Sequence, residues 1–386
     1  MQSIMKLCFI AQRKPSITYG GGKAQYYLAD VLQEEGHSVT LIGPEDFPGE
    51  GHSQAGFQRF LAEQGAQYDV IDFDHNFLLP EDDEILNGKT LLVARSVLFQ
   101  LHQPFINYPL SRAWKSRLRH FVTKHYKRKQ NAQLHQALVD SLQRADLINL
   151  SSRLDVVRAV DCGISRDKVV LLPFALEEEV VEGFQSIPTV SLGDSPIIVF
   201  LGTFDFRKGC LDTVKIFEMI RQEIPQARLR ILGAKGVFTN EKAIMQLFPK
   251  CDRENVELHM RFDPSTLGEL IGDATLGLFP SYHEGWGFAI MEQLAAGKPV
   301  FAYNAPGASD MLPSQWLGPP GDCAYLANLC IDCLHLQQQT YLQQAEHARG
   351  IVKAYRWRQI AHETLGAYTQ AINAKVTKFR SEPRKI

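Results

Sequence analysis

The most informative stretch of the chain is LGLFPSYHEGWGFAIMEQLAAGKPVFA, residues 276–302. It opens with a short apolar run that is typical of a buried strand, and a polar turn over 280–284 follows. An apolar periodicity then predicts a helix that begins near Phe288, and a second strand is expected over 299–302. This order indicates one βαβ step of a parallel sheet, where ligands bind at the carboxyl ends of the strands. The sequence therefore predicts an α/β fold with a binding site at this turn.

Two carboxylates, Glu284 and Glu292, bracket the predicted start of the helix with seven residues between them. Gly285 and Gly287 allow a ligand to approach the backbone closely, and the N–H groups of a helix N-terminus attract anions. The alternative is that Glu284 is an ordinary loop residue and that Glu292 lies on a solvated helix face, since acids are common near helix starts. The glycines and acids together favour a ligand-binding turn.

A longer motif runs through the same stretch and contains Pro280-Ser281, Glu284-Gly285-Trp286-Gly287-Phe288, Glu292 and Ala296-Gly297-Lys298-Pro299-Val300. It resembles the E-x7-E signature of the family 4 glycosyltransferases. The resemblance implies a GT-B fold, in which two Rossmann-like domains face each other across a cleft and a C-terminal helix crosses back to the first domain. It also implies metal-independent transfer of a sugar from a nucleotide-diphosphate-sugar to an acceptor, with retention of anomeric configuration.

A glycine run near the N-terminus is a second candidate site. Residues 6–11 are predicted to be a strand and residues 24–32 have helical periodicity, so Gly20, Gly21 and Gly22 fall in the loop between them. Bare backbone N–H groups and the dipole of the following helix would both favour an anion there. The alternative is a turn that serves only packing. In the family, a glycine pair at this point faces the donor diphosphate, which favours the binding role.

Two adjacent cations, Arg207 and Lys208, follow a strand predicted over 197–201. The glycines on either side, Gly202 and Gly209, would let the loop fold around a phosphate; the alternative is a surface turn. The resemblance implies that both cations grip the donor diphosphate. Because negative charge develops on that group as the sugar leaves, we expect them to stabilise the transition state.

The resemblance assigns further roles to this half of the chain. Glu292 should bind the ribose of the nucleotide, and Glu284 the hydroxyls or the developing charge of the transferred sugar. Relatives contact the nucleobase near the end of a strand predicted over 256–262, largely through the backbone. The predicted catalytic residues are Arg207, Lys208 and Glu284; the predicted donor-binding residues are Gly20, Gly21, Gly22, Gly202, Phe262, Gly285, Trp286, Gly287, Phe288 and Glu292.

The first half of the chain departs from the family pattern. Members often have a histidine just after the strand predicted over 91–93, whereas this chain reads Ala94-Arg95-Ser96. Ser96, His75 or His102 could contact the acceptor hydroxyl instead. In a retaining front-face mechanism the departing phosphate oxygen can itself take the acceptor's proton, so a dedicated base is not required.

An aspartate pair, Asp72 and Asp74, follows the D-x-D pattern that can hold a divalent cation. It falls at a strand end far in sequence from the donor motifs. Because folds of this kind usually neutralise the diphosphate with cationic side chains, we expect no metal there.

The segment 112–129 accumulates eight lysines and arginines without an acid, while aromatic and aliphatic residues recur at three- and four-residue spacing. This pattern predicts a basic amphipathic helix. One interpretation is a domain helix with a solvated basic face. The other is a docking surface for anionic lipid headgroups or an acidic acceptor.

We expect an N-terminal acceptor domain over 1–183, a donor domain over 184–355 and a closing helix over 356–386. The net charge of −2 and the apolar content of 45% disfavour disorder and nucleic-acid binding. The sequence lacks an apolar run of the roughly 18 residues needed to span a membrane and a signal-peptide pattern. We therefore expect a cytoplasmic protein, which the basic segment could bring to the inner face of the membrane.

Two other functions fit parts of the sequence. A catalytically silent protein that keeps the nucleotide-sugar site is supported by the Ala94-Arg95-Ser96 departure. An oxidoreductase that binds a dinucleotide at the glycine run is disfavoured, because no acidic residue is placed for the ribose and the second domain is itself nucleotide-binding in pattern.

Overall fold

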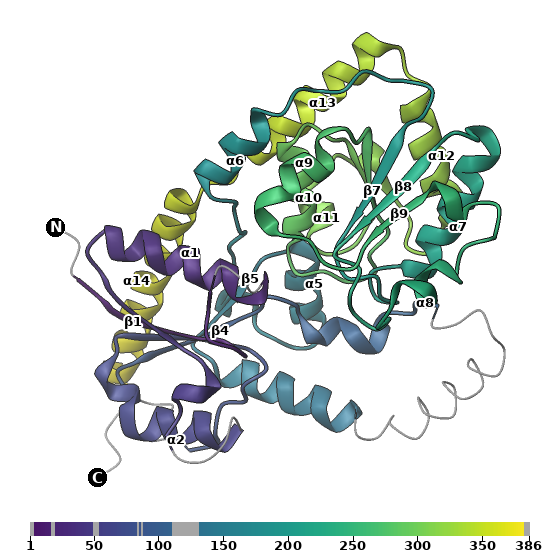
Figure 1. Cartoon of the computed structure of the whole chain (residues 1–386). Coiled ribbons are helices and arrows are strands. Elements are labelled where there is room, and N and C mark those ends of the chain that lie inside the picture. The colour runs from purple at the N-terminus through teal and green to yellow at the C-terminus, as the bar shows by residue number, and fades with distance from the viewer. Residues whose placement is uncertain are drawn as a thin grey trace. The chain divides into compact units, whose positions relative to one another are not determined.

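The computed structural model describes residues 4–16, 20–48, 54–82, 85, 88–109 and 131–381. They divide into two compact units, each described here by itself (Figure 1). Unit 1 contains the described parts of 1–104 and 131–175 together with 355–381. Unit 2 contains 105–109 and Leu176–Ala354.

Unit 1 is built on a six-stranded parallel sheet in the order β2-β1-β3-β4-β5-β6. Residues 131–144 are also helical. The strands are β1 (Lys6–Ile10), β2 (Ser38–Ile42), β3 (Val70–Asp74), β4 (Leu91–Arg95), β5 (Leu147–Leu150) and β6 (Val169–Leu171); the helices are α1 (Gly20–Glu34), α2 (Gln54–Gln64), α5 (Arg153–Asp161) and α14 (Trp357–Ser381), with 3-10 turns η1 (Pro44–Asp46), η2 (Gly65–Gln67), η3 (Gln100–Phe105) and η4 (Arg166–Lys168).

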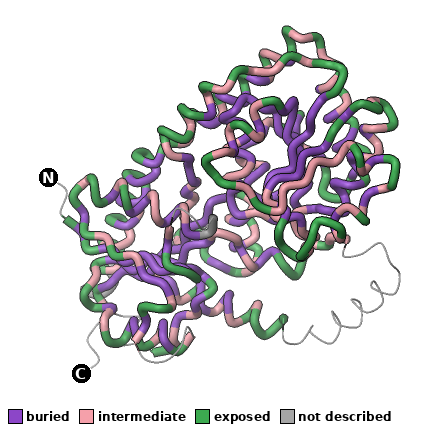
Figure 2. Tube along the Cα trace, viewed as in Figure 1, coloured by how far each residue is buried: buried purple, intermediate pink, exposed green. Residues whose placement is uncertain are grey.

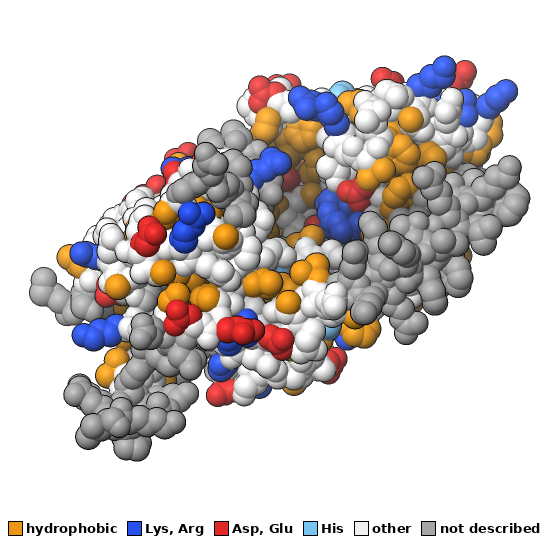
Figure 3. Space-filling model, turned by 90° about the horizontal axis from the view of Figure 1, so that it is seen from below, with side chains coloured by type: hydrophobic (Ala, Val, Ile, Leu, Met, Phe, Trp, Pro, Cys, Tyr) orange, Lys and Arg blue, Asp and Glu red, His pale blue; other side chains and the backbone are white. Residues whose placement is uncertain are grey.

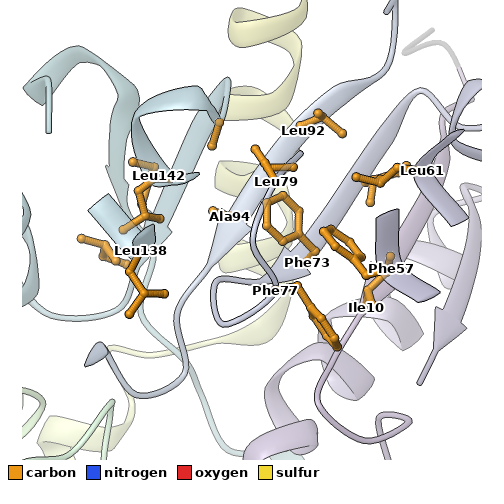
Figure 4. Packing of buried hydrophobic residues seen from close by; sticks show 14 of the residues in the cluster. Ile10, Phe57, Leu61, Phe73, Phe77, Leu79, Leu92, Ala94, Leu138 and Leu142 are labelled. Carbon is orange, nitrogen blue, oxygen red and sulfur yellow. The ribbon is translucent and has the colours of Figure 1, made fainter. Parts of the chain in front are cut away.

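One face of this sheet carries an aromatic core. Phe57 of α2 lies against Phe73 of β3 and Phe77, with ring centroids 5.2 and 5.0 Å apart (Figure 4). Leu138 and Leu142 of the 131–144 helix belong to the same buried cluster. Because successive strand residues point to opposite faces, the alternate positions of the same strands face α14.

Unit 2 has a second six-stranded parallel sheet, in the order β12-β11-β10-β7-β8-β9. Its central strands are buried throughout (Figure 2). The strands are β7 (Ile197–Leu201), β8 (Arg228–Leu232), β9 (Val256–His259), β10 (Leu276–Phe279), β11 (Val300–Tyr303) and β12 (Leu317–Gly318); the helices are α6 (Glu178–Gln185), α7 (Cys210–Glu223), α8 (Glu241–Met245), α9 (Leu267–Gly272), α10 (Phe288–Ala295), α11 (Ala308–Met311), α12 (Cys323–Leu334) and α13 (Gln338–Val352), with 3-10 turns η5 (Arg253–Asn255), η6 (Pro264–Thr266) and η7 (Ser314–Trp316).

Between the two sheets, the unit boundary falls between Ala175 and Leu176. Residues 178–185 form α6, which belongs to unit 2. Arg349 of α13 donates hydrogen bonds to the carbonyl oxygens of Gln185 and Ile187 at 2.5 and 2.7 Å. These contacts fix the start of unit 2 ahead of its first strand.

Three local predictions differ from the structure. The helix α1 begins at Gly20, so the glycines form its first turn rather than a preceding loop. The strand β9 ends at His259, which places Phe262 beyond it. The strand β4 continues to Arg95, so Ala94 and Arg95 lie within the strand and only Ser96 follows it.

Arg95 extends β4 because its charge is neutralised inside the sheet. Its guanidinium donates to both oxygens of Asp72 on β3, at 2.9 and 2.7 Å, and both side chains are almost fully buried. Tyr368 of α14 donates a hydrogen bond to the same carboxylate. Asp72, the first aspartate of the D-x-D pair, therefore links α14 to the sheet through this hydrogen bond.

The basic segment 112–129 lies outside the described residues. Over the face seen in Figure 3, positive and negative side chains are interspersed, as the small net charge leads one to expect. Within the residues that the structure describes, no helix has the length and apolarity to cross a membrane.

Candidate active site

Three loops meet at the carboxyl edge of the unit 2 sheet, one after each of the strands β7, β10 and β11. The backbone N–H of Tyr282 donates to the carbonyl oxygen of Arg207 at 2.9 Å, which joins the first two loops. A Cβ at Gly209 would collide with the carbonyl oxygen of Pro280, so only glycine fits there. A Cβ at Gly307 would collide in the same way with the backbone of Trp286. Close backbone packing thus holds the three loops together.

The predicted catalytic residues Arg207, Lys208 and Glu284 come together at this edge. Oε1 of Glu284 lies 2.8 Å from Nζ of Lys208 and 3.0 Å from a guanidinium nitrogen of Arg207. The hydroxyl of Ser281 donates to the same oxygen at 3.0 Å. Arg207 also donates to the carbonyl oxygen of His283. The side chains of Glu284 and Lys208 are only 13% and 14% exposed, so these charges act in a partly dry environment.

The two cations control the ionisation of Glu284. Burial alone would raise the pKa of this carboxyl, but attraction by Lys208 and Arg207 outweighs burial and lowers the pKa to about 2. Glu284 is therefore a carboxylate at neutral pH. It can accept hydrogen bonds from hydroxyl groups and can stabilise positive charge, but it cannot act as a general acid there.

This arrangement predicts a pH-dependent contribution to stability. Lowering the pKa of Glu284 from 4.5 to about 2 corresponds to about 3 kcal/mol. Because the pKa is lowered on folding, the contribution is present above about pH 4.5 and is lost as the pH falls towards 2. Urea unfolding should show Glu284→Gln less stable than wild type at pH 7, with a gap that narrows towards pH 3.

Glu269→Gln is the matched control, because Glu269 is exposed on α9 of the same unit. Its free energy of unfolding should equal that of wild type at every pH. A gap between wild type and Glu284→Gln that stays constant from pH 7 to pH 3 would contradict the assigned ion pairs.

The position of Lys208 is fixed from several sides. Its backbone N–H donates to a carboxylate oxygen of Asp205 at 2.9 Å, and Thr203 donates to the other oxygen at 2.7 Å. Its Nζ lies 5.5 Å from the ring centroid of Phe279, within cation–π range. Gly202, next to the lysine side chain, has φ +131°, a backbone conformation that favours glycine.

The predicted donor-binding residues 285–288 form the turn into α10. Gly287 has φ +93° and lies immediately before the helix, so the first-turn N–H groups point towards the carboxyl edge of the sheet. The ring of Trp286 is 3% exposed, and its Nε1 donates to the sulfur of Met291. The indole is thus a packing group, whereas Phe288 is half-buried and Gly285 is buried.

Glu292 lies one turn further along α10 and is half-buried. Its neighbours on either side in sequence, Met291 and Gln293, are buried. The helix α10 starts at the carboxyl edge of the sheet, where the ligand is expected. A carboxylate one turn into this helix can reach a group outside the sheet, which is compatible with the predicted ribose contact.

Phe262 lies beside the first of the three loops. Its ring edge would be 3.2 Å from a Cβ at Gly233, the residue that follows β8, and Gly202 lies next to the same point. Gly233 has φ +77°. Two glycines and a half-buried aromatic ring therefore line the carboxyl ends of β7 and β8.

The remaining predicted residues belong to unit 1. The first turn of α1 is formed by Gly20, Gly21 and Gly22. The N–H groups of a first turn have no acceptor within the helix. Ser96 is 1% exposed at the end of β4, and its backbone N–H donates to the carbonyl oxygen of Asn149.

The two candidate histidines, His75 and His102, are both buried in unit 1. His75 accepts a hydrogen bond from the backbone N–H of Gln100 at 3.2 Å, and burial lowers its pKa, so the ring is neutral at pH 7. His102 lies 2.8 Å from a carboxylate oxygen of Asp155 on α5. Each histidine is held within unit 1.

The sequence predicted no role for four residues that the structure places in or next to this site: Ser281, Asp205, Tyr282 and Asp212. Ser281 and Asp205 could have been found as small polar residues that flank the charged ones. Asp212 could have been found as an acid within the apolar pattern of α7, where it is 2% exposed.

Two other features of unit 2 lie apart from these residues. A groove of about 750 Å³ is lined by Val180, Phe184, Ile187 and Pro188 on one side and by Gly268 and Glu269 of α9 on the other. Its mainly apolar lining does not suit a diphosphate. In the described part of the chain, no group of three or more His, Cys, Asp or Glu side chains is placed to hold a metal ion.

Comparison with known proteins places these loops in a wider context. Residues 185–349 match the family model described as "Glycosyl transferases group 1". O-antigen chain mannosyltransferase B of Escherichia coli is 22% identical over 245 residues, which are 61% of this chain and 62% of that protein. The match thus spans somewhat less than two thirds of that relative's length.

Solved structures resemble the whole chain. Anabaena HepE, solved in complex with UDP and glucose, aligns with TM-score 0.64 and 15% identity over 95% of this chain and 99% of its own. Sucrose-phosphate synthase of Thermosynechococcus elongatus aligns with TM-score 0.68 and 17% identity over 96% and 100%. Trehalose 6-phosphate synthase of Burkholderia multivorans aligns with TM-score 0.65 and 14% identity over 100% of both chains. These likenesses establish the GT-B fold. The family match over residues 185–349 shows that the part of the chain that carries the charged loops is similar to the Glycosyl transferases group 1 family.

Proposed function

We propose that this protein transfers a sugar from a nucleotide-diphosphate-sugar to an acceptor with retention of anomeric configuration, using Arg207, Lys208 and Glu284. The observation that carries the proposal is the cluster around Oε1 of Glu284, where two cations and a serine converge at the end of β10. The resemblance to the family implies that a site of this composition holds a donor diphosphate.

The chemistry follows from the charges. Cleavage of the anomeric C–O bond leaves negative charge on the diphosphate and positive charge on the sugar ring. Arg207 and Lys208 supply fixed positive charge for the first, and the ionised Glu284 supplies negative charge for the second. Since their neighbours already hold all three in place, little reorganisation is needed during the reaction.

The donor would exchange partners with Glu284. In the structure, both cations are compensated by this carboxylate. A diphosphate brings more negative charge than one carboxylate, so it would draw the cations towards itself and release Glu284 to accept hydrogen bonds from the sugar. The helix start after Gly287 would add N–H donors to the diphosphate.

For the nucleotide, we propose that Phe262 with the backbone near Gly202 and Gly233 holds the base and that Glu292 holds the ribose. HepE has been solved with UDP and with UDP-glucose, and the curated relative is a mannosyltransferase. UDP- and GDP-linked hexoses are therefore the first donors to test.

Donor binding can be measured without knowing the acceptor. Among UDP-glucose, UDP-N-acetylglucosamine, GDP-mannose and ADP-glucose at millimolar concentration, at least one should raise the melting temperature. Ligand at one hundred times its Kd stabilises the folded state by about 2.7 kcal/mol. If none of the four shifts the transition, the donor site is misassigned.

A catalytically silent protein on the same fold is the alternative, because Arg95 is buried in an ion pair where many relatives have a histidine. The transferase and the silent protein are distinguished by incubation with the donor that raises the melting temperature. The measurement is the slow release of nucleoside diphosphate from that donor. An enzyme hydrolyses its donor slowly in the absence of acceptor, whereas a silent protein binds the donor and leaves it intact.

We propose that the acceptor is a glycan, a glycolipid or a small molecule. We also keep the hypothesis that the basic segment 112–129 contacts an anionic membrane surface. It rests on the sequence alone, and flotation with anionic vesicles at low and high salt tests it.

A further inference from the structure

We propose that Asp212 is a positioning residue for the donor site, which it serves by holding Tyr282 and Tyr303 in place. The inference rests on the proposed function, because it concerns the loops that carry Arg207, Lys208 and Glu284. Asp212 touches none of the proposed substrate groups and acts through the two tyrosines.

Asp212 accepts two phenol hydrogen bonds on one oxygen. The hydroxyl of Tyr303 donates to Oδ2 at 2.9 Å, and that of Tyr282 donates to the same atom. The two rings are edge-on with centroids 5.2 Å apart. Burial, followed by the neighbouring Asp212 charge, raises the pKa of both phenols, so both remain neutral donors at physiological pH. The carboxylate thus joins an aromatic residue of the loop after β10 to the last residue of β11.

Each residue of this triad belongs to a different part of the site. Asp212 is in the first turn of α7, four residues after Lys208 in sequence. Tyr282 lies between Ser281 and Glu284, on the loop after β10. Tyr303 is the last residue of β11 and leads into the turn that packs against the backbone of Trp286. One buried carboxylate therefore connects all three loops.

Tyr282 has a second contact that transmits this connection. Its backbone N–H donates to the carbonyl oxygen of Arg207, while its hydroxyl holds Asp212. Tyr282 thus holds the loop over 203–209 at Arg207 through its backbone. It holds the start of the following helix, α7, at Asp212 through its hydroxyl. If the hydroxyl is lost, the distance between Lys208 and Glu284 is no longer fixed from that side.

Tyr282 is also enclosed by two further residues. Gly321 leaves room for its hydroxyl, since a Cβ there would lie 3.3 Å from the phenol oxygen. The ring of Tyr108 lies 6.0 Å from that of Tyr282. Tyr282 is 9% exposed as a whole residue, so only a small part of it reaches solvent, and its hydroxyl is directed inward at Asp212.

Ordinary core packing is the competing explanation, and unit 2 contains a matched case. Tyr341 of α13 is fully buried, and its hydroxyl donates to the carbonyl oxygen of Thr275 at 2.7 Å. Tyr341→Phe removes one buried phenol hydrogen bond, as Tyr282→Phe does, but Tyr341 bonds to the start of β10 rather than to a loop of the site. Both variants should lower the melting temperature.

The test compares Tyr282→Phe, Tyr303→Phe and Asp212→Asn with Tyr341→Phe and wild type. Hydrogen–deuterium exchange of peptides covering 203–209 and 280–287 reports loop order without a donor. Donor hydrolysis, followed as nucleoside diphosphate release from the stabilising donor, gives kcat and KM.

Exchange in both peptides should rise in Tyr282→Phe and Asp212→Asn and stay at the wild-type level in Tyr341→Phe. Because misplacement of a reacting group by about 1 Å can cost about a hundredfold in rate, kcat should fall by roughly tenfold to a hundredfold in these two variants. KM should change much less, and Tyr303→Phe should show a smaller fall in kcat.

The inference is overturned if Tyr282→Phe and Asp212→Asn match Tyr341→Phe in exchange and in kcat at similar melting temperatures. Failure of the proposed function looks different, because wild type would then release no diphosphate from any donor. The exchange comparison decides the positioning role in that case as well.

Discussion

Lys208→Ala is expected to lower the rate of sugar transfer, or of donor hydrolysis, by on the order of a hundredfold or more while the protein stays folded. Lys208 is one of two cations placed to stabilise the leaving diphosphate. Its Nζ is fixed by Glu284 at 2.8 Å and by the ring of Phe279, so the charge is in position before the reaction. Removal of a preorganised charge affects the transition state more than it affects the fold.

The loss should appear in kcat as well as in donor affinity. Glu284 keeps Arg207 and Ser281 as partners in the variant, so it is not left as an uncompensated charge. Lys250→Ala, at an exposed position of the same unit, is the control and should behave as wild type. Turnover by Lys208→Ala at the wild-type rate would show that the diphosphate does not bind at this lysine.

The second large effect concerns stability. Asp72→Ala should destabilise the protein by about 3–5 kcal/mol, because it leaves the guanidinium of Arg95 buried without its partner. It also removes the acceptor of the Tyr368 hydroxyl and so loosens α14 from the sheet of unit 1. Urea unfolding measures the loss, and the unfolding of unit 1 should account for it.

A double replacement separates the charge effect from simple packing. Asp72→Leu with Arg95→Met removes both charges together, and we expect most of the stability to return. Arg358→Ala is the control for an exposed pair, since Arg358 and Glu34 are 66% and 59% exposed, and it should cost less than about 1 kcal/mol. Equal losses in Asp72→Ala and Arg358→Ala would contradict a buried structural ion pair.

This ion pair also explains the departure at Ala94-Arg95-Ser96. The family resemblance led us to expect a histidine near this point, and the sequence suggested Ser96, His75 or His102 as replacements. Arg95 is committed to Asp72 inside the sheet, so it takes no part in acceptor chemistry. The sequence placed Arg95 after the strand because a charged residue normally ends a buried run, and its partner is 23 positions away.

Strand positions were largely predictable from sequence because fully buried parallel strands are continuous apolar runs. The predicted strands over 197–201 and 276–279 match β7 and β10, and α10 begins at Phe288 as expected. Arg207, Lys208 and Glu284 could be predicted as a group because the motif fixes their spacing from strand ends. That they meet on a single oxygen of Glu284 could not be predicted from spacing.

The parts that the sequence could not predict depend on side-chain contacts in the folded chain. The ring of Trp286, a predicted donor-binding residue, turns inward to Met291, a direction that the motif does not encode. The triad of Asp212, Tyr282 and Tyr303 joins residues up to 91 positions apart. Hydrogen bonds of this range appear only when the three loops are folded together.

The most direct measurement of the central claim is calorimetric titration of the nucleoside diphosphate of the stabilising donor into wild type and Lys208→Ala. Both proteins should be folded, and the Kd of Lys208→Ala should be at least about tenfold weaker, which corresponds to about 1.4 kcal/mol. The same Kd for both proteins would contradict a diphosphate site at Arg207, Lys208 and Glu284.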